Sequence, residues 1–309
     1  MPSPKTKNII AALLLTGMAM AFLAGCRTAT PVPGSPTPDT GTPVLTDIPA
    51  ATATITATPE PMALTVNGEG VPLAEYDAQL KQLQAADVEL GKTRTPEEQR
   101  QIVLDELINQ TLMAQAAFEG GFQLDEAGLQ QRIDTLSVDL GGQAVLDAWM
   151  AANSYSQASF RTAMRRAVAS AWQRDALINA VPEQVEQVRA QQILVRQLST
   201  AEGVIRQLGA GADFATLAAE YDPITSGILG WFPRGYLTQP AVEEAAFALQ
   251  SGEYSPVVET DFGYHIIYVI ERESNRILSV DARLTLQHQA LDSWLETRRS
   301  SSTVEVLLP

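Results

Sequence analysis

Between positions 72 and 172 the polar and apolar residues follow a helical period. Apolar side chains recur three and four positions apart, so each segment presents one apolar face. In the first segment this face carries Leu73, Tyr76 and Leu80. The pattern predicts five helices, which start near Pro72, Thr95, Asp125, Val145 and Ser156.

Several helix ends are marked by residues that favour helix termini. Thr95 and Glu98 have the spacing of a capping box, and Gly120-Gly121 favours termination of the same helix. Upstream of the first helix, residues 64–71 predict two short strands joined by a Gly-rich turn. The region therefore reads as a helical domain that opens with a short strand pair.

The apolar faces of these helices admit two interpretations. They can pack on one another as an ordinary core, or they can line a cradle for unfolded polypeptides. For any single residue the pattern favours packing, so Trp149 and Trp172 are expected in the core before they are expected to contact a client.

From residue 189 onward the pattern changes to short strands and short helices. Alternating residues predict a strand over Arg189–Val195, after which Ser199, with Glu202 three residues later, is expected to cap a helix. A second helix begins near Asp213, with Phe214 in the core. Further strands are expected near Leu229–Phe232, Pro256–Val258 and Tyr264–Ile270, and a helix is expected from about Pro240 to Leu249.

The end of the chain returns to a helical period. Residues 280–298 predict a helix, and residues 304–308 predict a final strand. The buried face of this helix is expected to comprise Leu284, Leu291, Trp294 and Leu295. His288 lies on a polar stretch and is expected at the surface.

The beginning of the chain has the anatomy of a signal peptide. A basic start at Lys5 and Lys7 is followed by the apolar run Ile9–Leu23, which small residues close at Cys26. This arrangement resembles the bacterial lipoprotein signal, in which the cysteine receives lipid. The alternative is a short transmembrane anchor, but the run is shorter than the roughly 20 residues that a span needs.

Composition narrows the possible partners and the character of the linker. The formal net charge of −15 argues against nucleic acid as a partner, because nucleic-acid binding needs a basic face. Cys26 is the only cysteine, so no intrachain disulfide is possible. Residues 27–61 are rich in Pro, Thr and Ala and are expected to be an extended, disordered tether.

A series of short motifs between residues 227 and 272 resembles the parvulin peptidyl-prolyl isomerases. In order, the motifs are Gly230-Trp231-Phe232, Arg234-Gly235, Glu243-Glu244-Ala245-Ala246-Phe247, Ser251-Gly252-Glu253 and Phe262-Gly263-Tyr264-His265-Ile266-Ile267. The resemblance covers roughly residues 188–272. It implies that the predicted strands form a four-stranded antiparallel sheet flanked by helices, and that the reaction needs no metal and no cofactor.

The resemblance also implies the site residues. The catalytic positions would be Gln192, Asp222, Thr260 and His265, and the substrate-binding positions would be Leu237, Val242, Phe247 and Phe262. Three features depart from the family pattern, because Gln192 stands where the first of two facing histidines is expected, Val242 is often Phe, and the loop after Asp222 is short. A hydrogen bond between Gln192 and His265 is feasible, but Gln cannot titrate, so any pH dependence would fall on His265. Together the three departures lead us to expect weak activity.

Two of these residues have structural alternatives. His265 can be a catalytic group, or a structural histidine that bonds to backbone and stiffens the sheet. Asp222 can belong to the site, or it can cap the turn before Pro223.

Taken together, the expected fold class is α+β, with a parvulin domain inserted into a helical, chaperone-like domain. The expected segments are a signal peptide (1–25), Cys26 with the linker (26–62), a helical domain (63–182), a parvulin domain (183–274) and a C-terminal helix and strand that pack on the helical domain (275–309).

The expected function is peptidyl-prolyl isomerisation of exported polypeptides, outside the cytoplasmic membrane and tethered to it by lipid. The partners would be unfolded chains with Xaa-Pro bonds, and the membrane through the anchor. The alternative is a weakly catalytic or non-catalytic chaperone that binds Pro-containing segments.

Overall fold

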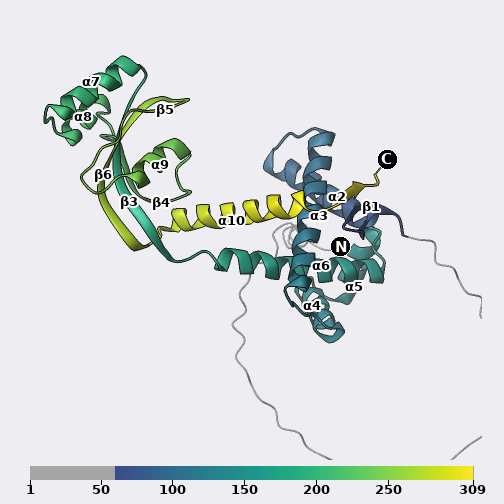
Figure 1. Ribbon diagram of the computed structural model, residues 1–309. Helices are drawn as coiled ribbons and strands as arrows, with labels where there is room; N and C mark the ends of the chain where they lie inside the picture. Colours follow the sequence, from purple (N-terminus) through teal and green to yellow (C-terminus); the bar gives the residue numbers. More distant parts are fainter. Residues whose placement is uncertain (1–59, 309) are drawn as a thin grey trace, which may run out of the picture. The chain divides into compact units, whose positions relative to one another are not determined.

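The computed structural model describes residues 60–308 (Figure 1). The expected signal peptide, Cys26 and nearly all of the expected linker lie outside the described residues. The chain divides into two compact units. The first takes in the residues up to Ile108, Asp125–Arg165 and the end of the chain from Val304, and the second takes in Asn109–Leu124 and Arg166–Thr303.

The first unit contains a three-stranded antiparallel sheet built from both ends of the described chain. Its strands are β1 (Met62–Val66), β2 (Glu69–Pro72) and β7 (Val304–Val306), in the order β2-β1-β7. Asn67 and Gly68 form the turn between β1 and β2 with φ values of 53° and 83°, a backbone region that Asn and Gly tolerate. β7 pairs with β1, and Leu307 N–H donates to the Ala63 carbonyl at 2.8 Å.

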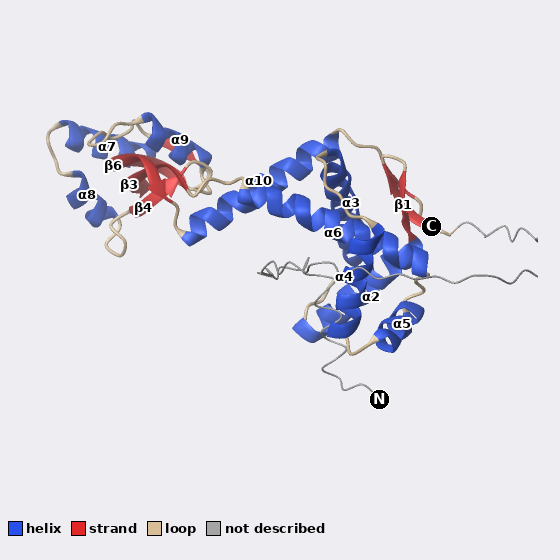
Figure 2. Ribbon diagram, turned by 90° about the horizontal axis from the view of Figure 1, so that it is seen from below, coloured by secondary structure: helices blue, strands red, loops and turns tan. Residues whose placement is uncertain are grey.

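The five helices expected from the periodicity are present (Figure 2). Leu107, Leu112, Leu129 and Leu146 are among the fully buried side chains that these helices contribute. The helices are α2 (Leu73–Leu90), α3 (Pro96–Glu119), α4 (Glu126–Asp139), α5 (Gln143–Ala152) and α6 (Gln157–Asn179), of which α3 and α6 contribute to both units.

The capping box at the start of α3 is confirmed. Thr95 N–H donates to the Glu98 carboxylate at 2.7 Å, and Glu98 N–H donates to the Thr95 hydroxyl at 3.2 Å. The hydrogen bonds from Thr95 lower the pKa of Glu98 because they stabilise its charged form. Ser156 caps α6 in the same manner, accepting from Ser159 N–H at 3.0 Å.

The two tryptophans of this helical region differ in burial. Trp149, which was expected in the core, stacks on Tyr155 at 5.6 Å between ring centroids and is half-buried. Trp172 was expected in the core as well, but 41% of its surface is exposed. Its ring contacts Phe122 at 5.4 Å between ring centroids.

The second unit contains the expected four-stranded antiparallel sheet. The strand order is β4-β3-β6-β5, so the first and last long strands of the sheet lie next to each other at its centre. The strands are β3 (Gln184–Val195), β4 (Ile228–Pro233), β5 (Val258–Thr260) and β6 (Gly263–Ile277). This sheet and its flanking helices confirm the α+β fold class.

Each face of this sheet is covered by helices. On one face, Ile193, Val195 and Ile266 pack against α7 (Leu198–Gly209) and α8 (Phe214–Tyr221). On the other face, which we call the α9 face, Val188, Ala190, Phe232, Ile267 and Val269 pack against α9 (Pro240–Ala248). Side chains alternate between faces along a strand, so the pairing of β3 with β6 decides which residues meet on each face.

Three expectations for this half of the chain are wrong in detail. α7 begins at Leu198 after Gln197, without a side-chain cap, so Ser199 lies inside the helix. The strand expected at Pro256–Val258 is observed as β5, two residues later at both ends, since Pro256 has no N–H for the ladder.

The third correction concerns α10 (Val280–Ser300), in which Leu284 is 48% exposed. The other three expected residues, Leu291, Trp294 and Leu295, are half-buried. In its first half the helix packs through Ala282, Leu286 and Ala290, which lie four residues apart and belong to the cluster of Val181 and Leu278. This face lies nearly opposite Leu284 on the helix, because two residues advance a helix by about 200°.

Replacing Thr95 tests the contribution of the capping box. We expect Thr95→Ala to lower the free energy of unfolding by about 1 kcal/mol, because it leaves a helix N–H without its acceptor. Urea denaturation of the two chains measures this difference. Thr95→Ser, which keeps the hydroxyl, should lie close to the unmodified chain, and equal losses for Ala and Ser would contradict the capping role.

Candidate active site

The residues Gln192 and His265 are brought together by the pairing of β3 with β6. Gln192 lies opposite Ile267, and Leu194 lies opposite His265, so the two polar side chains are diagonal neighbours. Both lie on the α9 face, because they share strand parity with Ala190 and Ile267 of that core. Thr260 joins them from β5, where Val258 lies opposite His265 and Thr260 lies opposite Gly263.

A chain of hydrogen bonds links these three side chains. The Nδ1 atom of His265 is 2.9 Å from Oε1 of Gln192, and Nε2 is 2.8 Å from the hydroxyl of Thr260. The amide oxygen can only accept, so Nδ1 carries the ring proton. In a neutral ring Nε2 then accepts, and the Thr260 hydroxyl donates to it.

The ring of His265 is held in its neutral form. Only 3% of the residue is exposed, and this desolvation lowers the pKa of His265 below its ordinary value of 6.5. No carboxylate is bonded to the ring; its partners are an amide and a hydroxyl. The expected Gln192–His265 hydrogen bond is therefore present, and it joins two uncharged groups at neutral pH.

Asp222 lies at the end of α8, and the backbone and side chains of its own loop surround its carboxylate. The N–H groups of Ile224 and Thr225 donate to it at 3.1 Å, Gly227 N–H donates at 3.2 Å, and the Thr225 hydroxyl donates as well. These donors, with Thr225 first, lower the pKa of Asp222 to about 2. The carboxylate is thus ionised at neutral pH, and its contacts are those of a loop cap.

The loop that Asp222 closes rests directly on Gln192. Gln192 N–H donates to the Gly227 carbonyl at 2.8 Å, and a Cβ on Gly227 would lie 1.8 Å from the Gln192 carbonyl oxygen. Gly227 also has a φ of 66°, so both the backbone conformation and the close approach require glycine. Asp222 therefore acts on Gln192 through the loop.

The four residues expected to bind substrate differ in exposure. Val242 and Phe247 are buried in the α9-face core, with 3% and 4% exposed. Leu237 is partly buried against the same core, and Phe262 is 66% exposed in the turn between β5 and β6. Leu237 and Phe262 thus have surface to offer a ligand, whereas Val242 and Phe247 support the layer beneath.

The motif that contains Glu243 drew attention in the sequence, but no role followed from it. In the structure its carboxylate accepts hydrogen bonds from three successive backbone N–H groups, those of Gly235, Tyr236 and Leu237, at 2.6, 3.0 and 3.0 Å. A glutamate eight residues from its partner has no periodic signature, so only the folded loop identifies this contact.

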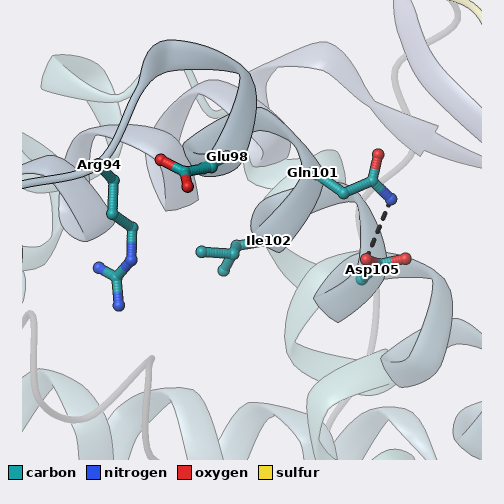
Figure 3. A pocket seen from close by; sticks show the side chains of 5 residues that line it. All are labelled: Arg94, Glu98, Gln101, Ile102 and Asp105. Atoms are coloured by element: carbon teal, nitrogen blue, oxygen red, sulfur yellow. Dashed lines mark hydrogen bonds between the residues drawn. The ribbon is translucent and has the colours of Figure 1, made fainter.

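A surface hollow of about 290 Å³ lies elsewhere, in the first unit (Figure 3). Arg94, Glu98, Gln101, Ile102 and Asp105 line it. Gln101 donates to Asp105 at 3.0 Å across one turn of α3. The residues of the candidate site are absent from its lining.

Among residues 60–308, no helix is both long and apolar enough to span a bilayer.

Two family models match this chain. The PPIC-type PPIASE domain matches residues 178–271, which contain β3, β4, β5, the first part of β6 and the Gln192–His265–Thr260 chain. The SurA-like N-terminal domain matches residues 50–164, which contain α2 to α5 and the first part of α6.

Curated relatives match over parts of their length. The chain is 36% identical over 126 residues to a foldase protein PrsA from Geobacillus sp. (strain WCH70), a match that covers 39% of this chain and 45% of the relative. It is 48% identical over 90 residues to the foldase protein PrsA of Caldanaerobacter subterraneus, a match that covers 28% and 29% of the two chains. The chain thus spans less than half the length of these relatives.

Among solved structures, the PrsA peptidylprolyl isomerase of Bacillus anthracis is 20% identical, with a TM-score of 0.39, covering 64% of this chain and 95% of that one. Residues 178–271 of this chain therefore match the PPIC-type PPIase domain, and residues 50–164 match a SurA-like N-terminal domain.

Proposed function

We propose that this protein is a peptidyl-prolyl isomerase that assists the folding of exported polypeptides, outside the cytoplasmic membrane and tethered to it. The PpiC-type domain and the foldase relatives support this reading. The observation that carries it is the hydrogen-bonded chain from Gln192 through His265 to Thr260 on the α9 face.

The reaction asks for a preorganised polar site and no bond cleavage. A prolyl peptide bond resists rotation by roughly 18–20 kcal/mol, because resonance keeps it planar. A site lowers this barrier when its fixed donors and apolar walls fit the twisted amide better than the planar one. The α9 face offers fixed polar groups beside Leu237, whose partly buried side chain would contact the proline ring.

Gln192 would take a direct part in this scheme. Its Oε1 atom is held by His265, and within residues 60–308 its Nε2–H₂ group makes no hydrogen bond to a protein acceptor. The amide is thus oriented by the imidazole and retains donors for a substrate carbonyl. His265 and Thr260 would act by fixing this orientation, and Asp222 by holding the loop against the Gln192 backbone.

A second function, the binding of unfolded chains without catalysis, is favoured by an exposed aromatic cluster in the second unit. Phe118 and Trp172 are each about two-fifths exposed, and both contact Phe122, at 5.8 and 5.4 Å between ring centroids. Exposed apolar groups of this kind are typical of surfaces that bind other chains. The SurA-like N-terminal domain supports the same reading.

The tether would be lipid on Cys26. Cys26 follows Leu23-Ala24-Gly25 at the end of an apolar run of signal-peptide length. Residues 27–61 would then act as a spacer between the lipid and the folded chain.

Isomerase kinetics on a series of Xaa-Pro peptides test the enzymatic proposal. We expect weak activity from the unmodified chain and a ten- to hundredfold lower kcat/KM, on the order of 1–3 kcal/mol, for His265→Ala. Gln192→His should raise kcat/KM, because an imidazole has fewer rotatable bonds to fix than the Gln side chain.

Circular dichroism and melting curves of the same variants separate lost activity from lost folding. If both the unmodified chain and a folded Gln192→His variant lack isomerase activity, the enzymatic proposal is overturned. Suppression of aggregation of a model client by that silent chain would then favour the binding function.

The pH dependence of activity is set by His265. Protonation makes Nε2 a donor, so the Thr260 hydroxyl must turn away, toward the Gly263 carbonyl 3.4 Å away. The folded pKa lies below 6.5, so both activity and the stability contributed by the neutral ring are complete above pH 6.5 and are lost as pH falls through the folded pKa.

A pH profile of kcat/KM, with a midpoint below 6.5, is the expected result. His288→Gln, which removes the chain's other histidine from the surface, should leave the profile unchanged. A midpoint at or above 6.5 would contradict the assignment to a desolvated His265.

The tether is tested by Cys26→Ser. We expect the variant to accumulate as an unprocessed precursor without lipid, because serine has no thiol to acylate. Mass spectrometry of the variant and of the unmodified chain checks whether the signal segment has been removed and whether residue 26 carries lipid. A mature chain with a free, unmodified Cys26 would be evidence against the anchor.

A further inference from the structure

The residues 234–237, which we call the pocket loop, connect β4 to α9 and carry Leu237 into the candidate site. The loop has no strand pairing of its own, so its position depends on side chains that contact it. Two elements supply them, α9 through Glu243 and α10 through Gln289.

Glu243 holds the loop from within the domain. Gly235 has a φ of 83°, and this left-handed residue turns its own N–H and the next two toward a common point. Successive N–H groups in such a turn form a concave anion site. The Glu243 carboxylate occupies that site, and hydrogen bonds to an ionised acceptor are stronger than neutral ones.

α10 holds the same loop from the other side. The Gln289 Nε2–H₂ group donates to the Gly235 carbonyl. A Cβ on Gly235 would lie 2.7 Å from Oε1 of Gln289 and 3.3 Å from Cδ2 of Leu286. The glycine is thus required by its φ of 83°, and a side chain there would also displace the end of Gln289.

Tyr236 joins the two contacts. It packs against the α9-face core that contains Val242 and Phe247, and also against the cluster that Leu278 forms with Ala282 of α10. The pocket loop therefore lies between two hydrophobic clusters, with a charged hydrogen-bonded contact on one side and an amide contact on the other.

We propose that Glu243 and Gln289 are positioning residues for the isomerase site, and that α10 is part of the support of the proline pocket. The proposal rests on the proposed isomerase function. It places the functional boundary of the domain beyond residue 271, where the family match ends, because Leu286 and Gln289 lie downstream of it.

The experiment uses the full chain with two pairs of variants. Glu243→Gln removes the charge and one acceptor, and Glu244→Gln removes the same charge from the exposed neighbouring position on α9. Gln289→Glu is isosteric but loses the donor, whereas Gln289→Lys keeps a donor. His288→Ala serves as the exposed control on α10.

For Glu243→Gln we expect kcat/KM to fall about ten- to a hundredfold, since a misplacement of about 1 Å can cost about a hundredfold. The loss should appear mainly in KM, and discrimination between proline and its six-membered homologue pipecolate should weaken. Gln289→Glu should lower kcat/KM in the same way, whereas Gln289→Lys should keep a kcat/KM close to that of the unmodified chain. Glu244→Gln and His288→Ala should match the unmodified chain.

Amide hydrogen exchange gives a readout that does not depend on activity. The amides of Gly235, Tyr236 and Leu237 should exchange at least tenfold faster in Glu243→Gln than in Glu244→Gln. Equal exchange rates in the two variants would overturn the role of Glu243 in holding the pocket loop, whatever the kinetics. Faster exchange with unchanged kcat/KM and unchanged pipecolate discrimination overturns the positioning role and leaves the isomerase function intact. If the unmodified chain has no isomerase activity, the isomerase function is overturned, and with it the positioning role of Glu243 and Gln289. The exchange rates then still decide whether Glu243 holds the pocket loop.

Discussion

The antiparallel pairing of β3 with β6 fixes which side chains of the second unit can meet. Successive residues of a strand point to opposite faces, so a slip of one residue would move Gln192 to the face covered by α7 and α8. In the observed register Ile193 and Ile266 fill that face, while Gln192 and His265 share the α9 face with Ile267. The hydrophobic residues therefore impose the register, and the register brings the two polar residues together.

A buried polar group on such a face needs partners. An imidazole left without hydrogen bonds would cost about 1–3 kcal/mol, and His265 avoids this cost through Gln192 and Thr260. Gln can play this part because its amide offers both an acceptor and donors. The same bond that satisfies the buried ring also orients the free amide donors, so the stability of the sheet and the geometry of the site depend on one contact.

The sequence could predict the elements whose signals are local. The periodicity located five helices, the spacing of Thr95 and Glu98 gave the capping box, and the order of motifs gave the four-stranded sheet. It could not predict the exposure of Trp172, because an apolar face does not reveal how completely its neighbours cover it.

Contacts between residues far apart in the sequence could not be predicted either, because the sequence pattern does not show which elements pack together. The apolar residues of α10 are numerous enough to suggest several buried faces, and only contact with Val181 and Leu278 selects the one through Ala282 and Leu286. Asp222 was recognised as a candidate with two roles, and its donors are those of a loop cap. Glu243 lay in a recognised motif, but its role could not be predicted, since its partners are backbone groups.

The connectivity of the chain gives these contacts a further consequence. β1 and β7 pair in the first unit. The second unit, Asn109–Leu124 and Arg166–Thr303, therefore lies in sequence between segments of the first unit. The segment that interrupts it, Asp125–Arg165, also belongs to the first unit. α10 is the element that leads from β6 to β7, and it is also the element that contacts Gly235. A helix that only connected two units would need no contact with the pocket loop. Gln289 of α10 donates to the Gly235 carbonyl, and Leu286 packs in the same cluster as Tyr236, so the segment that follows the family match contributes contacts to the pocket loop.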